Sequence, residues 1–321
     1  MKTLKFIDHP VKISVSQYDM LKTKLVNSLI SNDAVLSVYQ MGSVKHPGIS
    51  DLDIICVFKN DSQCGENYRL DLSVDEKNIL THAIFGIEEQ DLIKSMSYNL
   101  ISNLKHLGGK DLGLEKEDIS TNAEFRRQIA LEYMVKMLIT IDAQVRFKVI
   151  KLRAFLLLAK AIEFDLQLLN VKNGKLYDLV LQVIEYRSNW YTNKPSHKDV
   201  SALVLSFNKE LKLFLEKELF NSKLYLPLKI FTLPGNFTIQ KDNTFSITHK
   251  GLVLPNQFSF LGKKYINLQF RLNSFFYRVP FDLPNDNSVH NQRFQFGKDL
   301  VIKNKEQYPH FIPLTTSLSV Y

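Results

Sequence analysis

Two aspartates one residue apart, Asp51 and Asp53, open an apolar run that continues to Phe58. A carboxylate inside such a run is costly unless a neighbouring group satisfies its charge. Side chains at positions i and i+2 of a strand point to the same face, so the two carboxylates project together. Leu52 and Ile54 then pack on the opposite face. The pattern predicts a strand over 52–58 that begins with a carboxylate pair.

A carboxylate pair of this kind favours a bound cation. Without a cation the two charges repel each other, and two Mg²⁺ ions about 3.5–4 Å apart fit the spacing. An expected strand over 35–41 ends just before, at Gly42 and Ser43. Gly42 leaves room for a triphosphate, and Ser43 offers a hydroxyl and an N–H to a phosphate oxygen. The alternative is an Asx-type turn at Asp51 with Asp53 paired to a buried cation, but this turn explains only Asp51.

The arrangement resembles the DNA polymerase β-like nucleotidyltransferase superfamily. The motif of that superfamily is an apolar residue, Gly-Ser, a variable spacer, and Asp-apolar-Asp-apolar. Here it reads Met41-Gly42-Ser43, seven spacer residues, and Asp51-Leu52-Asp53-Ile54, within a resemblance that covers roughly 15–115. The resemblance implies a mixed sheet flanked by helices. It also implies Mg²⁺- or Mn²⁺-dependent transfer of NMP from an NTP such as ATP to an acceptor hydroxyl, with release of pyrophosphate.

The resemblance further implies a third carboxylate on a later strand. Residues 68–74 alternate like a half-buried strand, although the start of a helix is also possible. Asp71 is therefore the first candidate catalytic residue, but a solvated edge position explains it equally well. Glu88 or Glu89 is the second candidate, just past an expected strand at 80–87. His82 on that strand is a candidate base, but a lone histidine is more often structural. A site without a third acid is the remaining alternative.

Basic residues raise the question of a polyanionic partner. The chain has 321 residues, with 41 Lys and Arg against 33 Asp and Glu, a formal net charge of +8. Such an excess favours a nucleotide or RNA. Arg146, Arg153 and Lys160 recur every seven residues, which predicts either a phosphate-binding helix face or a solvated one.

The C-terminal region offers a second candidate surface. Its aromatic residues alternate with cations, which is typical of a stacking platform for single-stranded nucleic acid and also of a β-rich core. These residues are Phe258, Phe260, Tyr265, Phe270, Phe275, Phe276 and Tyr277, with Lys263, Lys264, Arg271 and Arg278.

We expect an α/β nucleotidyltransferase domain with a mixed sheet over 1–115, a helical domain over 116–225, and a small β-rich region over 226–321. The expected helices are 16–31 with Ser16 as N-cap, 89–104, two within 121–170 that separate near 141–144, 175–191 and 198–220.

The sequence shows neither a secretory signal nor a span long enough for a bilayer, and two cysteines make no disulfide framework. We therefore expect a cytoplasmic protein without a membrane partner.

Two functions are compatible with these patterns. In the first, the chain is a nucleotidyltransferase in which Asp51 and Asp53 hold the metal and, with Asp71, catalyse transfer to a small molecule, an RNA end or a protein. In the second, a degenerate nucleotidyltransferase fold holds nucleotide as a regulatory module without turnover. The third carboxylate is the feature that separates the two.

Overall fold

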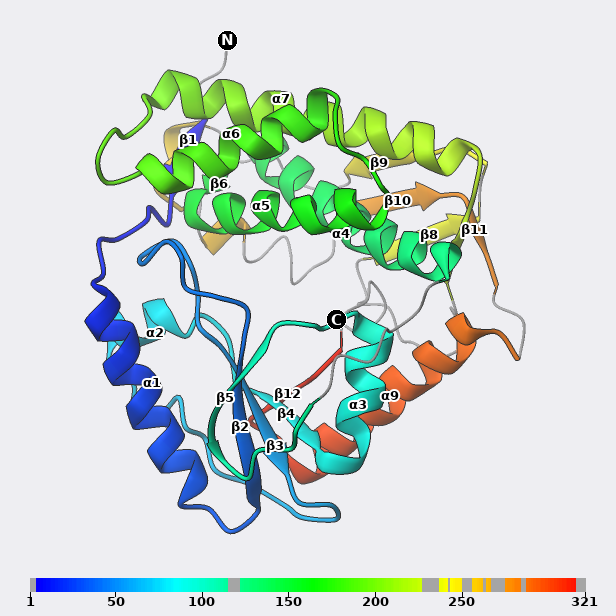
Figure 1. Ribbon diagram of the computed structural model, residues 1–321. Helices are drawn as coiled ribbons and strands as arrows, with labels where there is room; N and C mark the ends of the chain where they lie inside the picture. Colours follow the sequence, from blue (N-terminus) through cyan, green and yellow to red (C-terminus); the bar gives the residue numbers. More distant parts are fainter. Residues whose placement is uncertain are drawn as a thin grey trace.

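A five-stranded mixed sheet with its helices forms one half of the molecule, and a layer of long helices forms the other (Figure 1). The computed structural model describes residues 4–114, 122–226, 237–241, 243–249, 256–261, 264–266, 275–283 and 287–315. The expected mixed α/β class is confirmed at this level. The nucleotidyltransferase arrangement of the first domain stays a prediction.

The five-stranded sheet has the order β12-β4-β3-β2-β5. Strand β3 is antiparallel to β2 and parallel to β4, while β2 also pairs antiparallel with β5 and β4 pairs parallel with β12. The strand expected after Asp51 is confirmed, although it begins at Asp53. The strands are β2 Val35–Met41, β3 Asp53–Phe58, β4 Phe85–Glu88, β5 Leu104–Gly109 and β12 Ile312–Pro313.

Helices cover both faces of this sheet because its central strand is apolar on both sides. Ile54, Cys56 and Phe58 pack with helix α1 (Val15–Ile30). Ile55 and Val57 pack on the other face with α3 (Glu89–Asn99) and α9 (Val289–Gln307). All five of these β3 side chains are fully buried. Figure 1 shows the sheet between α1 on one side and α3 and α9 on the other.

The prediction of a strand over 68–74 is wrong. Residues 68–71 form a turn, and helix α2 (Val74–Ile79) follows. Ser73 caps this helix: its side chain accepts a hydrogen bond from the N–H of Glu76, whose carboxylate accepts one from the N–H of Ser73. This capping box starts a helix where the alternation of apolar and polar residues indicated a strand.

Two helix boundaries and one further segment also differ from the expectation. Helix α1 is capped by Ser14 instead of Ser16, through a capping box with Gln17. Helix α3 ends at Asn99, because Leu100 adopts a left-handed φ of 52°. Residues 104–109, expected to be a helix end and a break, form β5 and pair with β2.

Four helices form the second layer and enclose the largest apolar core. The helices expected at 175–191 and 198–220 are confirmed. The break in the long helical stretch lies at Lys148, where φ is 56°, and not near 141–144. Strand β6 (Val149–Lys151) follows this break and pairs with β1 (Lys5–Ile7). The helices are α4 Ala123–Phe147, α5 Leu152–Leu168, α6 Lys175–Asn189 and α7 His197–Phe220.

The described part of the region after residue 226 is only partly β-structured. It contains the sheet β8-β10-β9 and strand β11, but the 19-residue helix α9 and strand β12 return to the five-stranded sheet. The region 226–321 is therefore not one β-rich unit. Its other elements are β8 Phe237–Lys241, β9 Ser246–His249, η1 Asn256–Leu261, β10 Phe275–Val279 and β11 Phe281–Asp282, which pairs with β7 Leu224–Tyr225.

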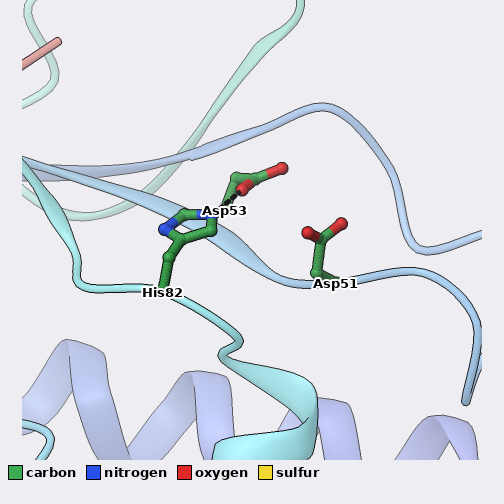
Figure 2. A group of neighbouring side chains, drawn as sticks. All are labelled: Asp51, Asp53 and His82. Carbon is green, nitrogen blue, oxygen red and sulfur yellow. Dashed lines mark hydrogen bonds and ion pairs between the residues drawn. The ribbon is translucent and has the colours of Figure 1, made fainter. Parts of the chain in front are cut away.

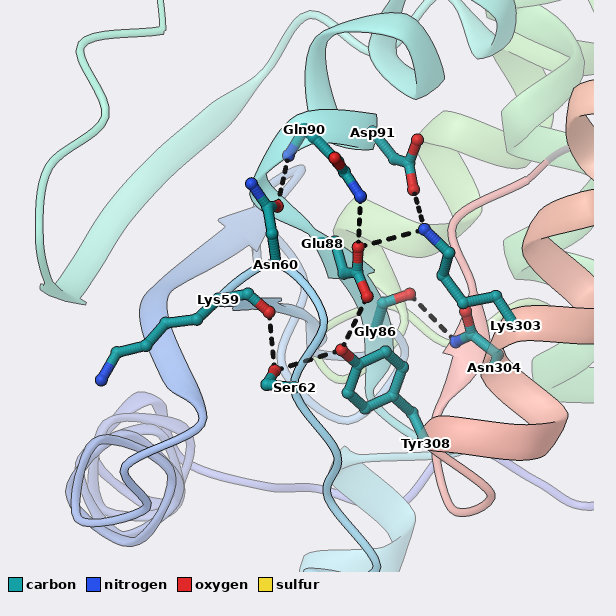
Figure 3. A network of polar contacts seen from close by, with 10 residues as sticks. All are labelled: Lys59, Asn60, Ser62, Gly86, Glu88, Gln90, Asp91, Lys303, Asn304 and Tyr308. Carbon is teal, nitrogen blue, oxygen red and sulfur yellow. Dashed lines mark hydrogen bonds and ion pairs between the residues drawn. The ribbon is translucent and has the colours of Figure 1, made fainter.

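A buried polar network joins α9 to the sheet (Figure 3). Glu88, only 1% exposed, accepts hydrogen bonds from Lys303 Nζ at 3.0 Å, Tyr308 OH at 3.1 Å and Gln90 Nε2 at 2.6 Å. Asn304 Nδ2 also donates to the carbonyl of Gly86 at 3.0 Å. Three donors satisfy the buried carboxylate, so α9 and its contacts complete the half of the molecule that contains the five-stranded sheet.

Candidate metal centre

Asp51, Asp53 and His82 come together where β3 begins and the chain approaches β4. Their potential ligand atoms all lie within 4.8 Å of one another, and each residue is half-buried. Figure 2 shows both carboxylates on the same side of the strand, with the His82 ring against Asp53. His82 Nε2 lies 2.6 Å from Asp53 Oδ1, and Thr81 Oγ1 donates to Asp51 Oδ2 at 3.3 Å.

The geometry of the pair follows from the pattern of the chain around it. Leu52 and Ile54 are 1% and 0% exposed and pack towards α1, which leaves the aspartates on the other side. Asp53 also pairs with Met41 in the β2–β3 register, so the end of β2 lies beside it. This juxtaposition agrees with the same-face placement expected from the spacing.

The centre concentrates negative charge. Burial raises the pKa of the Asp51 carboxyl and the charge of Asp53 raises it further, against smaller lowering effects of its own backbone, His82 and Arg153. Burial by itself lowers the pKa of His82. The hydrogen bonds to Asp53 and to the carbonyl of Ala83, with the charges of both aspartates, outweigh burial and raise it. A cation at this position is electrostatically favoured.

Both ring nitrogens of His82 face hydrogen-bond acceptors. Its Nδ1 lies 2.7 Å from the backbone oxygen of Ala83, and its Nε2 lies 2.6 Å from Asp53 Oδ1. Carbonyl and carboxylate oxygens only accept, so both nitrogens carry a proton in this metal-free arrangement. Histidines that bind metals commonly donate their other N–H to a carbonyl or carboxylate in this way.

Gly42 and Ser43 lie at the end of β2, beside this group. Gly42 has a φ of +69°, and a Cβ atom built on it meets nothing within 4 Å, so the space above it is open. Its N–H donates to the carbonyl of Asn103 at 3.0 Å. Ser43 is exposed, and its hydroxyl makes no hydrogen bond within the described ranges. The two residues thus leave room and one free hydroxyl near the carboxylates.

Arg153 of the helical layer holds the loop that leads into Asp51. Its guanidinium donates to the carbonyls of Ile49 at 3.0 Å, Ser50 at 2.9 Å and Asn78. Arg187, 7% exposed, donates to Ser50 Oγ at 3.4 Å from the same layer. Two buried or half-buried cations therefore orient the loop through its oxygen atoms.

Tyr18 of α1 holds the same loop from the opposite side. Its hydroxyl donates to the carbonyl of Ser50 at 2.5 Å and accepts from the N–H of Gly48 at 3.0 Å. Gly48 has a φ of +84° and packs so closely that an added Cβ would overlap Val11 O and the hydroxyl of Tyr191. The loop can adopt this path only with glycine at position 48.

We expect Gly48→Ala to lower the free energy of unfolding by about 2–4 kcal/mol, because backbone strain and overpacking add. Gly42→Ala is the matched control: its φ is also positive but its surroundings are open, so only about 1 kcal/mol of strain is expected. Urea denaturation of both variants measures the difference. Equal losses would contradict the tight packing around Gly48.

The prediction that Arg146, Arg153 and Lys160 lie on one helix face is wrong. The break near Lys148 places Arg146 on α4, while Arg153 and Lys160 lie on α5. Arg146 pairs with Asp142 one turn earlier, and Lys160 Nζ lies 3.2 Å from a carboxylate oxygen of Glu163. Arg153 binds backbone carbonyls, as described above. The three residues therefore do not lie on the face of a single helix.

None of the acids proposed from the sequence as the third carboxylate joins the group. Asp71 is exposed in the turn 68–71, away from any described strand. Glu88 pairs with Phe58 in the register of β4 and β3, at the far end of β3 from Asp53, and Glu89 begins α3. From the sequence, His82 was predicted only as a candidate base. Its position beside Asp53 depends on the parallel pairing of β3 and β4, which no local pattern reveals.

The expected aromatic platform is described only in part. Phe258 and Phe260 are exposed, with ring centroids 6.4 Å apart, whereas Tyr265 packs edge-on against Phe147. Lys264 and Arg278 are exposed. Outside the described residues lie Lys263, Phe270 and Arg271, and also the side chains of Phe275, Phe276 and Tyr277. The platform stays a prediction.

Comparison with known proteins finds no matching family, no similar curated protein and no similar solved structure. The resemblance to nucleotidyltransferases therefore rests on the motif and its context in the sequence. Among the described helices, none combines the length and the hydropathy needed to cross a membrane.

Proposed function

We propose that this chain is a divalent-metal-dependent nucleotidyltransferase that moves an NMP from an NTP to an acceptor hydroxyl. The observation that carries the proposal is the Asp51–Asp53 pair. Both carboxylates lie on the same side of the chain where β3 begins, beside the open space at Gly42. Burial and the charge of Asp53 raise the pKa of Asp51, and a cation between the two carboxylates relieves this repulsion. The open space beside them is available to a triphosphate.

The donor atoms fit the metal that the motif implies. Two carboxylates with solvent-accessible space suit Mg²⁺ or Mn²⁺, which keep several waters and share phosphate oxygens with the substrate. Asp51 and Asp53 would hold the ion. When bound, it neutralises charge on the phosphates and on the group that leaves.

Apart from the metal, the protein contributes by positioning the reacting groups. The acceptor oxygen bonds to the α-phosphorus as the bond from that phosphorus to the bridging oxygen breaks. Pyrophosphate leaves, and the proton of the acceptor hydroxyl passes to water. Gly42 leaves space for the phosphates and Ser43 donates a hydrogen bond to one of their oxygens. Arg153 and Tyr18 hold the loop before Asp51, so the carboxylates need little rearrangement when substrate binds.

The acceptor is a small molecule, an RNA end or a protein side chain. The net charge of +8 favours a polyanionic acceptor. Salt separates these classes, because binding of RNA releases counterions and weakens steeply as salt rises, whereas binding of a small neutral acceptor changes little.

One observation favours a second candidate function, that of a nucleotide-binding module without turnover. Within the described residues, the group contains two carboxylates and His82, without the third acid that the superfamily motif implies. A site that holds nucleotide but lacks one catalytic group would serve regulation.

The test is incubation with each labelled NTP, Mg²⁺ or Mn²⁺, and separate pools of RNA, protein and metabolites. Transfer of label with release of pyrophosphate, lost in Asp53→Asn, supports the enzyme. Saturable nucleotide binding without pyrophosphate supports the binding module. Neither binding nor release, in a protein that is folded by circular dichroism, contradicts both functions.

A further inference from the structure

We infer that His82 is a third ligand of the metal centre and makes it select a transition-series divalent cation such as Mn²⁺ over Mg²⁺. This inference rests on the proposed function, because it concerns the same site. The first supporting observation is the direction of the ring: Nε2 donates to Asp53 Oδ1 at 2.6 Å and lies within 4.8 Å of a ligand atom of Asp51, so a bound ion would take the place of its proton. The other ring nitrogen, Nδ1, donates a hydrogen bond to the carbonyl of Ala83, which leaves Nε2 as the nitrogen that can bind a metal.

The second observation is the rigidity of this position. His82 lies three residues before Phe85, which pairs with Ile55 in the parallel register of β4 and β3. The imidazole also packs edge-on against the Phe85 ring, with centroids 5.1 Å apart. The ligand atom is thus presented by the segment just before β4, with its ring held by a hydrogen bond and an aromatic contact.

The chemistry of the donors supplies the selectivity. Mg²⁺ strongly prefers oxygen ligands, whereas imidazole nitrogen suits transition metals, whose affinity rises from Mn²⁺ along the series. An all-carboxylate site of the same shape would accept Mg²⁺ readily. Replacement of one oxygen donor by a nitrogen lowers affinity for Mg²⁺ more than for Mn²⁺.

The experiment measures binding directly in the full chain without nucleotide. The paramagnetic resonance signal of free Mn²⁺ gives the Kd for Mn²⁺, and displacement of bound Mn²⁺ by Mg²⁺ gives the Kd for Mg²⁺. We expect wild type to bind Mn²⁺ at least about tenfold more tightly than Mg²⁺, and His82→Ala to lose about tenfold or more in Mn²⁺ affinity. His82→Asp restores an oxygen donor, so the ratio of the two Kd values should fall below about threefold.

His310→Asp is the control, because it adds the same charge at an exposed histidine outside the group. Thermal unfolding by circular dichroism confirms that each variant is folded. If wild type binds both ions equally, or if His82→Ala keeps the Mn²⁺ affinity, the inference is wrong while the proposed function stands. If wild type binds neither ion, with or without NTP, the metal assignment of the proposed function fails as well.

Discussion

Asp53→Asn is expected to lower nucleotidyl transfer by at least about two orders of magnitude, and Asp51→Asn should do the same. A bound metal supplies several kcal/mol of charge stabilisation, and each 1.36 kcal/mol corresponds to a factor of about ten in rate. Asparagine keeps the shape of the side chain but removes the charge that attracts the cation. Steady-state pyrophosphate release with saturating NTP measures the loss.

Stability measurements separate loss of the metal from loss of the fold. Burial and the charge of Asp53 raise the pKa of Asp51, so its ionised form is disfavoured in the metal-free protein. Asp51→Asn should therefore match or exceed the wild-type melting temperature without metal. Asp53→Asn removes the charge from the hydrogen bond that joins this residue to His82 and should be less stable by about 1 kcal/mol.

Two further aspartates complete this experiment. Asp61 is exposed and outside the group, so Asp61→Asn should keep full activity. Asp71→Asn tests the candidate that the sequence analysis placed on a strand, and its exposed turn predicts full activity too. Loss of activity in Asp71→Asn would show that Asp71 is a catalytic residue after all. Full activity in Asp53→Asn would contradict the metal assignment itself.

Arg293→Met is expected to cause the largest loss of stability, about 3–5 kcal/mol, because it leaves a buried carboxylate without its partner. Arg293 and Glu132 are 4% and 1% exposed. Two nitrogens of the guanidinium contact the two carboxylate oxygens at 2.9 and 3.0 Å. Arg293 Nε also donates to the carbonyl of Tyr98 at 3.1 Å. This ion pair joins α9 to α4, and hence the sheet layer to the helical layer. Urea denaturation followed by circular dichroism measures the change.

The double variant Glu132→Leu with Arg293→Met tests whether the cost comes from the unpaired charge. Replacement of both partners by apolar side chains removes both charges, so its loss should be smaller than the sum of the single losses. Glu216→Gln is the matched control, because Lys212 and Glu216 form an exposed pair at 4.0 Å on α7. For Glu216→Gln we expect the free energy of unfolding to fall by about 0–1 kcal/mol. Additive single losses would show that the ion pair acts only through local packing.

Local sequence patterns predicted much of the chain correctly where one strong signal acted alone. The apolar run after Asp53 became β3, and Ser196 caps a helix at the position expected for α7. The failures lie where two local signals competed. Alternation around Asp71 indicated a strand, but the capping box of Ser73 and Glu76 produced α2 instead. Left-handed residues such as Lys148 also ended helices without a glycine to mark them.

The sequence by itself predicted the carboxylate pair from a period of two residues, and the two side chains do lie on one side although β3 begins only at Asp53. It also allowed a positive φ at Gly42 without strain, whereas the open space there depends on the tertiary structure, as the crowded Gly48 shows. Only the tertiary structure decided that His82 meets Asp53, because their contact needs the pairing of β4 with β3 across a loop and a helix. Strand pairing depends on contacts between segments far apart in the chain, and a local pattern contains no information about such contacts.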